Sequence, residues 1–260
     1  MQESAGLLAA LPVRPSRDAQ SSETSLTPNT IRNTVWRVAV PVVPNDRRRL
    51  RREQTVAEIL AVAVQAMATD GVAGMSLSDV ARRVGMRPPS LYEYFPSKLA
   101  IYDAVFHDGF ETLNSVLRAA IPDFENDPIK ALRTVHPIFV RWCIENPVQS
   151  QLMFWRPVPG FKPSPAAFAP SIEQVGMVRD LLQAAVRMGQ LTEGAVTEEG
   201  MGLYSFIGSG LITQQLANDP SGGFPDGQYS RLASASLEMW ISHYSPADHA
   251  DRPPTARSTP

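Results

Sequence analysis

The sequence predicts an all-α protein, and three observations favour this fold class. Apolar residues recur at spacings of three and four along most of the 260 residues, which is the periodicity of helices with one buried face. Glycine and proline interrupt this pattern at Asp70-Gly71 and Asn146-Pro147, as they do at helix ends. Residues 76–98 join two short helical stretches through Gly85, the form of a helix-turn-helix. We therefore expect a head of three helices followed by a larger helical body.

The composition is that of a globular protein with a real core, since 43% of the residues are hydrophobic. The apolar runs 38–43 and 59–64 fall well short of the roughly 18 residues that a membrane-spanning helix needs. No basic segment precedes the apolar residues 7–11, so we expect a cytoplasmic protein without an export signal or membrane partner. The single cysteine, Cys143, excludes an internal disulfide framework and a cysteine-based zinc site.

Charge is divided unevenly along a chain whose net charge is only −2. Residues 47–98 hold nine Lys or Arg against five acidic residues, whereas residues 99–260 hold eleven against seventeen. A compact basic unit followed by a larger acidic one is typical of a DNA-binding head on a body that does not bind DNA. We divide the chain into a disordered N-terminal extension (1–46), the head (47–98), the body (99–245) and a disordered tail (246–260).

Five arginines lie within six positions immediately before the first helix expected from the periodicity, which begins near Gln54. Such a cluster suits phosphate contacts beside a helix-turn-helix, and the alternative is a solvated run of charge. The cluster consists of Arg47, Arg48, Arg49, Arg51 and Arg52.

The next two predicted helices form the helix-turn-helix itself. Ser76 stands where an N-cap is expected, and the helix that follows ends at Gly85. Pro88 and Pro89 fit only the first turn of a helix, so the second helix begins near Arg87 to Pro89. Within this helix Leu91 and Phe95 are predicted to pack inward.

Residues 50–106 resemble the DNA-binding domain of the tetracycline-repressor (TetR) family. The resemblance rests on Ser76-Leu-Ser-Asp-Val-Ala-Arg-Arg-Val-Gly85 and on Ser90-Leu-Tyr-Glu-Tyr-Phe-Pro-Ser-Lys98. Two departures are Tyr94, where the family often has histidine, and the stiff pair Pro88-Pro89. The resemblance implies a C-terminal helical body for ligand binding and dimerisation.

The DNA contacts divide into base-facing and phosphate-facing groups. Early residues of a helix that enters the major groove read base edges, so we assign Arg87, Pro89, Ser90 and Glu93 to the bases. By resemblance, the phosphate contacts are Ser76, Tyr92, Tyr94 and Lys98.

The body is predicted to hold helices over about 98–120, 127–145, 171–189, 197–217 and 228–244, with a long functional loop over 156–170. Its aromatic and thioether side chains favour a pocket for an apolar or aromatic effector, and ordinary core packing is the alternative. The pocket candidates are Phe139, Trp142, Met153, Phe154, Trp155, Phe161, Met177 and Tyr204. No cofactor or metal site is predicted.

Small residues in the helix over 197–217 favour close approach of another helix, because glycine is otherwise unfavourable there. The resemblance implies that the last two helices form a homodimer interface, and a kinked helix packed within one chain is the alternative. The interface candidates are Gly202, Ser205, Gly208, Ser209, Ile212, Leu232, Leu237 and Trp240.

These observations predict a repressor that binds a palindromic double-stranded operator as a homodimer and is released by a small, largely apolar effector. The alternative is a ligand-independent or architectural DNA-binding protein whose body serves only dimerisation. An enzyme is disfavoured, because His107, His136, His243 and His249 are scattered without ligand spacing and no nucleophile or phosphate-loop motif occurs.

Overall fold

The computed structural model describes residues 44–121 and 126–246, and in these residues the regular elements are helical. The chain divides into two compact units, residues 1–54 and 55–260, with the boundary inside the first helix. In chain order the elements are α1 (Pro44–Asp70), the 3-10 turn η1 (Val72–Gly74), α2 (Leu77–Val84), α3 (Pro88–Tyr92), α4 (Lys98–Ala120), α5 (Pro128–Glu145), α6 (Pro147–Phe154), α7 (Pro165–Arg187), η2 (Glu193–Val196), α8 (Glu198–Asn218), η3 (Ser230–Leu232) and α9 (Ala233–Tyr244). Among these helices, none combines the length and the apolarity needed to cross a membrane.

The first helix begins about ten residues earlier than the apolar periodicity predicts. α1 starts at Pro44, so residues 44–46 are helical. The prediction that the disordered extension reaches residue 46 was therefore wrong for these three residues. Residues 1–43 and the tail from 247 lie outside the described residues. Arginine is a good helix former, and Arg49 is 3.5 Å from Asp46 and 3.9 Å from Glu53. The arginine cluster therefore forms the first turns of a helix rather than a separate arm.

The helix-turn-helix follows the sequence prediction closely, with two local differences. Gly85 adopts a left-handed conformation (φ 78°), which lets α2 end and the chain turn into α3. Ser76 occupies the N-cap position of α2, but its side chain makes no capping hydrogen bond. α3 ends at Tyr92, earlier than expected, and Phe95 lies in the turn that follows it.

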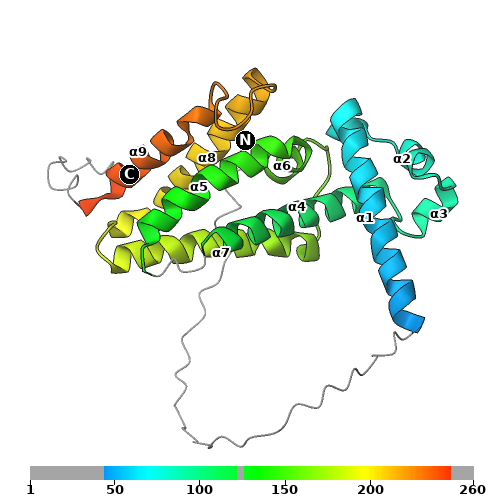
Figure 1. Cartoon of the computed structure of the whole chain (residues 1–260), viewed down its shortest axis with the longest axis horizontal. Coiled ribbons are helices and arrows are strands. Elements are labelled where there is room, and N and C mark those ends of the chain that lie inside the picture. Colours follow the sequence, from blue (N-terminus) through cyan, green and yellow to red (C-terminus); the bar gives the residue numbers. More distant parts are fainter. Residues whose placement is uncertain (1–43, 122–125, 247–260) are drawn as a thin grey trace, which may run out of the picture. The chain divides into compact units, whose positions relative to one another are not determined.

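In the body, α4 packs along α7 and α6, while α5 packs against α8 and α9 (Figure 1). α4 and α6 approach closely at Gly109, where a Cβ atom would lie 2.8 Å from Met153 Sδ. The predicted loop over 156–170 is shorter, because α7 begins at Pro165 with Ser164 as its cap and contains Pro170. Pro170 removes only one backbone hydrogen bond, so the helix continues through it.

Candidate nucleic-acid interface and surfaces of the body

The residues predicted to face bases surround the start of α3 and are accessible. Arg87, the N-cap of α3, and Pro89 are exposed, and Ser90 is half-buried. Beneath them Leu91 is 0% exposed and anchors the helix. Glu93 is exposed at the end of α3. α3 therefore presents polar groups on one side and is held by apolar packing on the other.

Of the four residues predicted to contact phosphates within the helix-turn-helix, Lys98 has an internal interaction that the sequence did not indicate. Its Nζ donates to the Ala73 carbonyl at 2.7 Å and lies 5.7 Å from the centroid of the Tyr102 ring. Ser76 is exposed, Tyr92 is 50% exposed and Tyr94 is half-buried. Lys98 thus ties the first turn of α4 to the turn before α2.

Two arginines of α2 carry further positive charge that the sequence analysis did not assign to DNA. Arg82 and Arg83 both pair with Asp79, Arg83 Nε at 2.5 Å from Asp79 Oδ2. The hydrogen bond from Arg82 is the main cause that holds the pKa of Asp79 below its usual value. Asp79 therefore holds both guanidinium groups on the surface of α2. The sequence could have predicted these ion pairs, because Arg82 and Arg83 follow Asp79 by three and four residues.

The joint between head and body is built from buried and half-buried contacts on α4. Tyr102 is 0% exposed, its hydroxyl donates to the Val72 carbonyl at 2.7 Å, and Phe161 packs against its ring at 5.7 Å. One residue along, Asp103 accepts hydrogen bonds from the backbone N–H and the hydroxyl of Ser164, both at 2.7 Å. The loop before α7 therefore contacts the same helical turn that holds η1.

The predicted pocket residues do not form one group. Phe139 and Phe154 are T-shaped neighbours with centroids 6.0 Å apart, whereas Phe161 lies at the head–body joint. Trp142 and Met153 are buried. Tyr204 packs against His136, and burial raises the pKa of the Tyr204 hydroxyl. The remaining candidates, Trp155 and Met177, are half-buried.

The predicted interface residues of α8 and α9 divide between the interior and the surface. Gly208, Ile212, Leu237 and Trp240 are buried within the chain and offer no side-chain surface to a second copy. A Cβ atom at Gly208 would lie 3.3 Å from Phe139 Cε1, so this glycine serves close packing of α8 on α5. Gly202, Ser205, Ser209 and Leu232 are exposed or half-buried.

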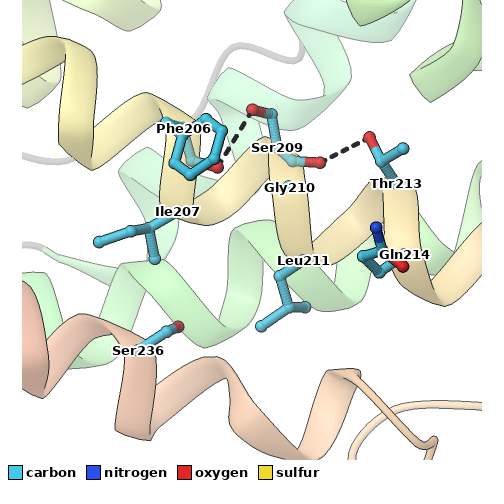
Figure 2. Close-up of a pocket in the computed structure, with 8 residues that line it drawn as sticks. All are labelled: Phe206, Ile207, Ser209, Gly210, Leu211, Thr213, Gln214 and Ser236. Atoms are coloured by element: carbon cyan, nitrogen blue, oxygen red, sulfur yellow. Dashed lines mark hydrogen bonds between the residues drawn. The ribbon is translucent and has the colours of Figure 1, made fainter.

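The exposed apolar side chains of α8 and α9 were missed by the sequence analysis. Phe206 is 70% exposed and Met239 is 74% exposed, and Leu203 is also exposed. Leu232 of η3, already an interface candidate from the sequence, is exposed as well. Figure 2 shows Phe206 among the residues that line an open groove, which include Ser209 and Gly210 of α8 and Ser236 of α9. This surface, made by one face of α8 and the adjoining part of α9, is called the α8–α9 face below. Periodicity identified the two helices but not which side of each faces outward.

The head matches a known family of regulators. The model of bacterial regulatory proteins of the tetR family matches residues 59–105, which include α2, α3 and the start of α4. Residues 59–105 therefore carry a TetR-type DNA-binding domain. HTH-type transcriptional regulator Rv1816 of Mycobacterium tuberculosis is 28% identical over 151 residues, 56% of this chain and 63% of that protein. The match thus spans less than two thirds of that relative.

Two further similarities extend over the body. Nucleoid occlusion factor SlmA of Photorhabdus laumondii is 25% identical over 206 residues, 78% of this chain and 89% of that protein. The crystal structure of RolR in complex with resorcinol has a TM-score of 0.51 at 19% identity, and covers 81% of this chain and 100% of the RolR chain. The likeness to RolR is one of fold.

Proposed function

We propose that this TetR-family protein is a transcriptional regulator, a repressor that binds a palindromic double-stranded DNA operator as a homodimer. The observation that carries the proposal is the accessible start of α3, where Arg87, Pro89 and Ser90 surround a helix anchored by Leu91. Arg87 suits bidentate hydrogen bonds to guanine, and Glu93 suits acceptance from cytosine N4. Tyr92, Tyr94 and Ser76 flank this surface and suit phosphate contacts.

Selection of bound sequences from a random DNA pool tests this proposal. We expect two related half-sites spaced by about one helical turn or slightly more. Arg87→Ala relaxes the preference at one position by about 1–3 kcal/mol, whereas Tyr92→Phe weakens all sites alike because only a phosphate-facing hydroxyl is lost. Arg187→Ala, which removes an exposed arginine of α7, serves as the control. A uniform loss of affinity from Arg87→Ala would contradict its base-reading role.

The homodimer is proposed to form through the α8–α9 face. Phe206 and Met239 are large apolar side chains exposed on adjacent helices, and the lining of the groove at Phe206 combines apolar residues with the small residues Ser209, Gly210 and Ser236. A symmetric interface of this kind places each Phe206 against the same face of the partner. Two heads then read two half-sites.

Sedimentation of the full chain tests the dimer. We expect a species of twice the monomer mass of 28.5 kDa at micromolar concentration. Phe206→Glu should shift the protein to monomer and weaken operator binding, because charge is unfavourable in an apolar interface. Met188→Glu places the same charge on another exposed apolar residue, beyond the end of α7, and should leave the dimer intact. A monomer for the unmodified chain, with and without DNA, would refute this part of the proposal.

Release by a small, largely apolar or aromatic effector is proposed for the body. Aromatic side chains of α4, α5 and α6 contact one another there, and RolR, which shares the fold, binds resorcinol in its crystal structure. An effector releases DNA only if it binds one conformation better than the other. The loop before α7 and its contacts with Tyr102 and Asp103 connect the body to the turn that precedes α2.

The similarity to a nucleoid occlusion factor favours a second candidate, a DNA-binding protein that needs no effector and whose body serves only dimerisation. A thermal-shift screen combined with operator titration separates the two. A ligand-gated repressor gains stability from a small compound and loses operator affinity in its presence. The second candidate binds DNA equally well with every compound.

A further inference from the structure

Two buried polar side chains of the body each have one atom without a hydrogen-bond partner. Asn114 on α4 is 0% exposed and His136 on α5 is 1% exposed. Asn114 Nδ2 donates to the Pro170 carbonyl at 2.8 Å, but its Oδ1 has no partner in the described part of the chain. His136 Nε2 has none there either. Such atoms destabilise a fold unless something else bonds to them, so their retention needs a reason.

The other fully buried polar side chains of the described residues are hydrogen-bonded. Ser150 donates to the Cys143 carbonyl at 2.8 Å, Ser171 donates to a carbonyl of its own helix, and Gln215 and Ser230 bond within the loop between α8 and α9. None of the buried polar side chains described is a lysine, arginine, aspartate or glutamate. Among the side chains that are buried as a whole, Asn114 and His136 are therefore the two with an unpartnered atom; Asp79, Gln190 and Thr192 each have one such atom in a side chain that is less buried.

Aromatic rings lie one helical turn from each of these groups. Phe110 precedes Asn114 by one turn on α4, and Phe139 follows His136 by one turn on α5, so each pair shares a helix face. Phe154 on α6 joins the two helices, with its ring centroid 5.9 Å from that of Phe110 and 6.0 Å from that of Phe139. Phe139 and Phe154 are half-buried, so this cluster is not fully closed to solvent.

Asn114 and His136 also lie at similar depth in the body. α4 and α5 pack together and run in opposite directions (Figure 1). At about 1.5 Å per residue, Asn114 lies about 9 Å along the axis from the last residue of α4, Ala120, and His136 about 12 Å from Pro128, the first of α5. Phe110 and Phe139, which both contact Phe154, place the turns that hold Asn114 and His136 at a similar level of the body.

The imidazole of His136 is neutral at physiological pH. Burial lowers its pKa to about 4, and the Tyr204 ring packs edge-on against it at 5.7 Å. A neutral imidazole with its proton on Nδ1 accepts a hydrogen bond at Nε2, and the amide oxygen of Asn114 is likewise an acceptor. The partner that completes both groups therefore supplies hydrogen-bond donors. An uncharged donor suits the site better than a cation, because none of the buried side chains described is acidic.

We infer that the effector is an uncharged aromatic molecule with hydroxyl donors, of the class of the dihydroxybenzenes. Its hydroxyl groups donate to Asn114 Oδ1 and His136 Nε2, and its ring packs against Phe110, Phe139 and Phe154. This assignment rests on the proposed ligand-gated function and specifies the chemistry of its effector. His136 and Asn114 are then the residues that select hydroxylated rings over plain hydrocarbons or carboxylates.

Thermal unfolding and calorimetric titration of the full chain test this inference with defined probes. The three dihydroxybenzenes are compared with toluene, which lacks donors, and with benzoate, which is charged. We expect at least one dihydroxybenzene to raise the unfolding temperature and to bind more tightly than both controls. The inference is overturned if toluene or benzoate binds as well as every dihydroxybenzene, or if none of the probes binds.

Variants separate a binding role from a structural one. His136→Phe and Asn114→Leu should leave the unfolding temperature of the free protein unchanged or higher, because each removes an unpartnered polar atom, and should weaken probe binding by about fivefold to thirtyfold. Ser150→Ala removes a buried hydroxyl that is bonded, and should lower stability without changing probe affinity. His136→Gln keeps an acceptor if the phenylalanine variant does not fold. Lower stability with unchanged probe affinity in both His136 variants would overturn the assignment.

Operator binding, measured on the same preparations, keeps this inference distinct from the proposed function. If the chain binds DNA but only toluene or benzoate binds to the body, the effector class is wrong and the regulator stands. If no DNA sequence is selected, the proposed function fails whatever the probes do. A dihydroxybenzene that binds through His136 and lowers operator affinity supports both.

Discussion

The head and the body place their candidate binding groups in opposite ways. In the head these groups lie within residues 76–98 and reach the surface, as Arg87, Tyr92 and Glu93 do. In the body they come from separate helices and are buried, as Asn114 and His136 are. A surface that reads DNA can be built from one short segment on a small core. A site that binds a small molecule inside a helical body needs several helices, and its polar groups lose their hydration when the protein folds.

The largest expected effect tests whether the short helix α3 depends on its single anchor. Leu91→Ala should lower the free energy of unfolding by about 2–5 kcal/mol, because Leu91 is 0% exposed and little of α3 can collapse into the space. Leu182→Ala in α7, also 0% exposed, should cost a similar amount. Denaturant unfolding measures both. At temperatures where both variants are folded, only Leu91→Ala should lose DNA affinity, and equal losses would contradict the division between head and body.

The next effect tests the tight packing of the body. A Cβ atom at Gly200 would lie 2.2 Å from the Gly194 carbonyl oxygen, which is backbone and cannot rotate away. Gly200→Ala should therefore destabilise the protein by about 1–3 kcal/mol. Gly176→Ala on α7, where nothing lies within 4 Å, should stabilise it by about 0.5–1 kcal/mol. If both substitutions shift the unfolding temperature in the same direction, the space around these two glycines does not determine the effect on stability.

A smaller effect distinguishes two tyrosines of similar sequence context. Tyr102→Phe leaves the buried Val72 carbonyl without its donor and should cost about 1–3 kcal/mol of stability. Tyr92→Phe removes an exposed hydroxyl and should change stability by less than about 0.5 kcal/mol while weakening DNA binding. Paired measurements of unfolding and DNA affinity check this. A loss of stability from Tyr92→Phe would mean that its hydroxyl supports the fold.

The smallest effect concerns an exposed ion pair of the body. Arg133 Nε donates to Glu238 Oε1 at 2.7 Å, and this hydrogen bond holds the pKa of Glu238 below its usual 4.5. The pair therefore stabilises the fold above pH 4.5, and its contribution is lost as the pH falls through the lowered pKa. Because both side chains are about half exposed, Glu238→Gln should cost no more than about 1 kcal/mol at neutral pH. Unfolding measured over a range of pH should show the difference at pH 7, and the difference should become smaller as the pH falls below 4.5.

The sequence predicted the head better than the body for a physical reason. Gly85 and Pro88 determine helix ends through local backbone chemistry, and the structure follows them to within a few residues. Ser76 occupies the predicted N-cap position, although its side chain makes no capping hydrogen bond. The start of α1 was placed too late, because apolar periodicity does not mark the exposed arginine turns as helical. Pro170 was read as part of a loop, although Ser164 and Pro165 begin α7 before it.

Which face of a body helix points inward depends on packing partners that one sequence does not reveal. Gly208 carried a valid signal of close helix approach, but the approach is to α5 of the same chain. Phe206 and Met239, which lie outside, had no distinguishing pattern. For Asn114 and His136 a signal was present, since each interrupts an apolar helix face, but scattered histidines were considered only as metal or catalytic groups.

The two prolines at the start of α3 have a calorimetric consequence. Each fixes its own φ angle, so the unfolded ensemble of this segment is already narrowed before any contact forms. A helix prepared in this way does not have to become ordered when it meets a major groove. The heat capacity change of complex formation should then reflect surface removed from water alone, without the additional decrease that accompanies coupled folding of a recognition segment.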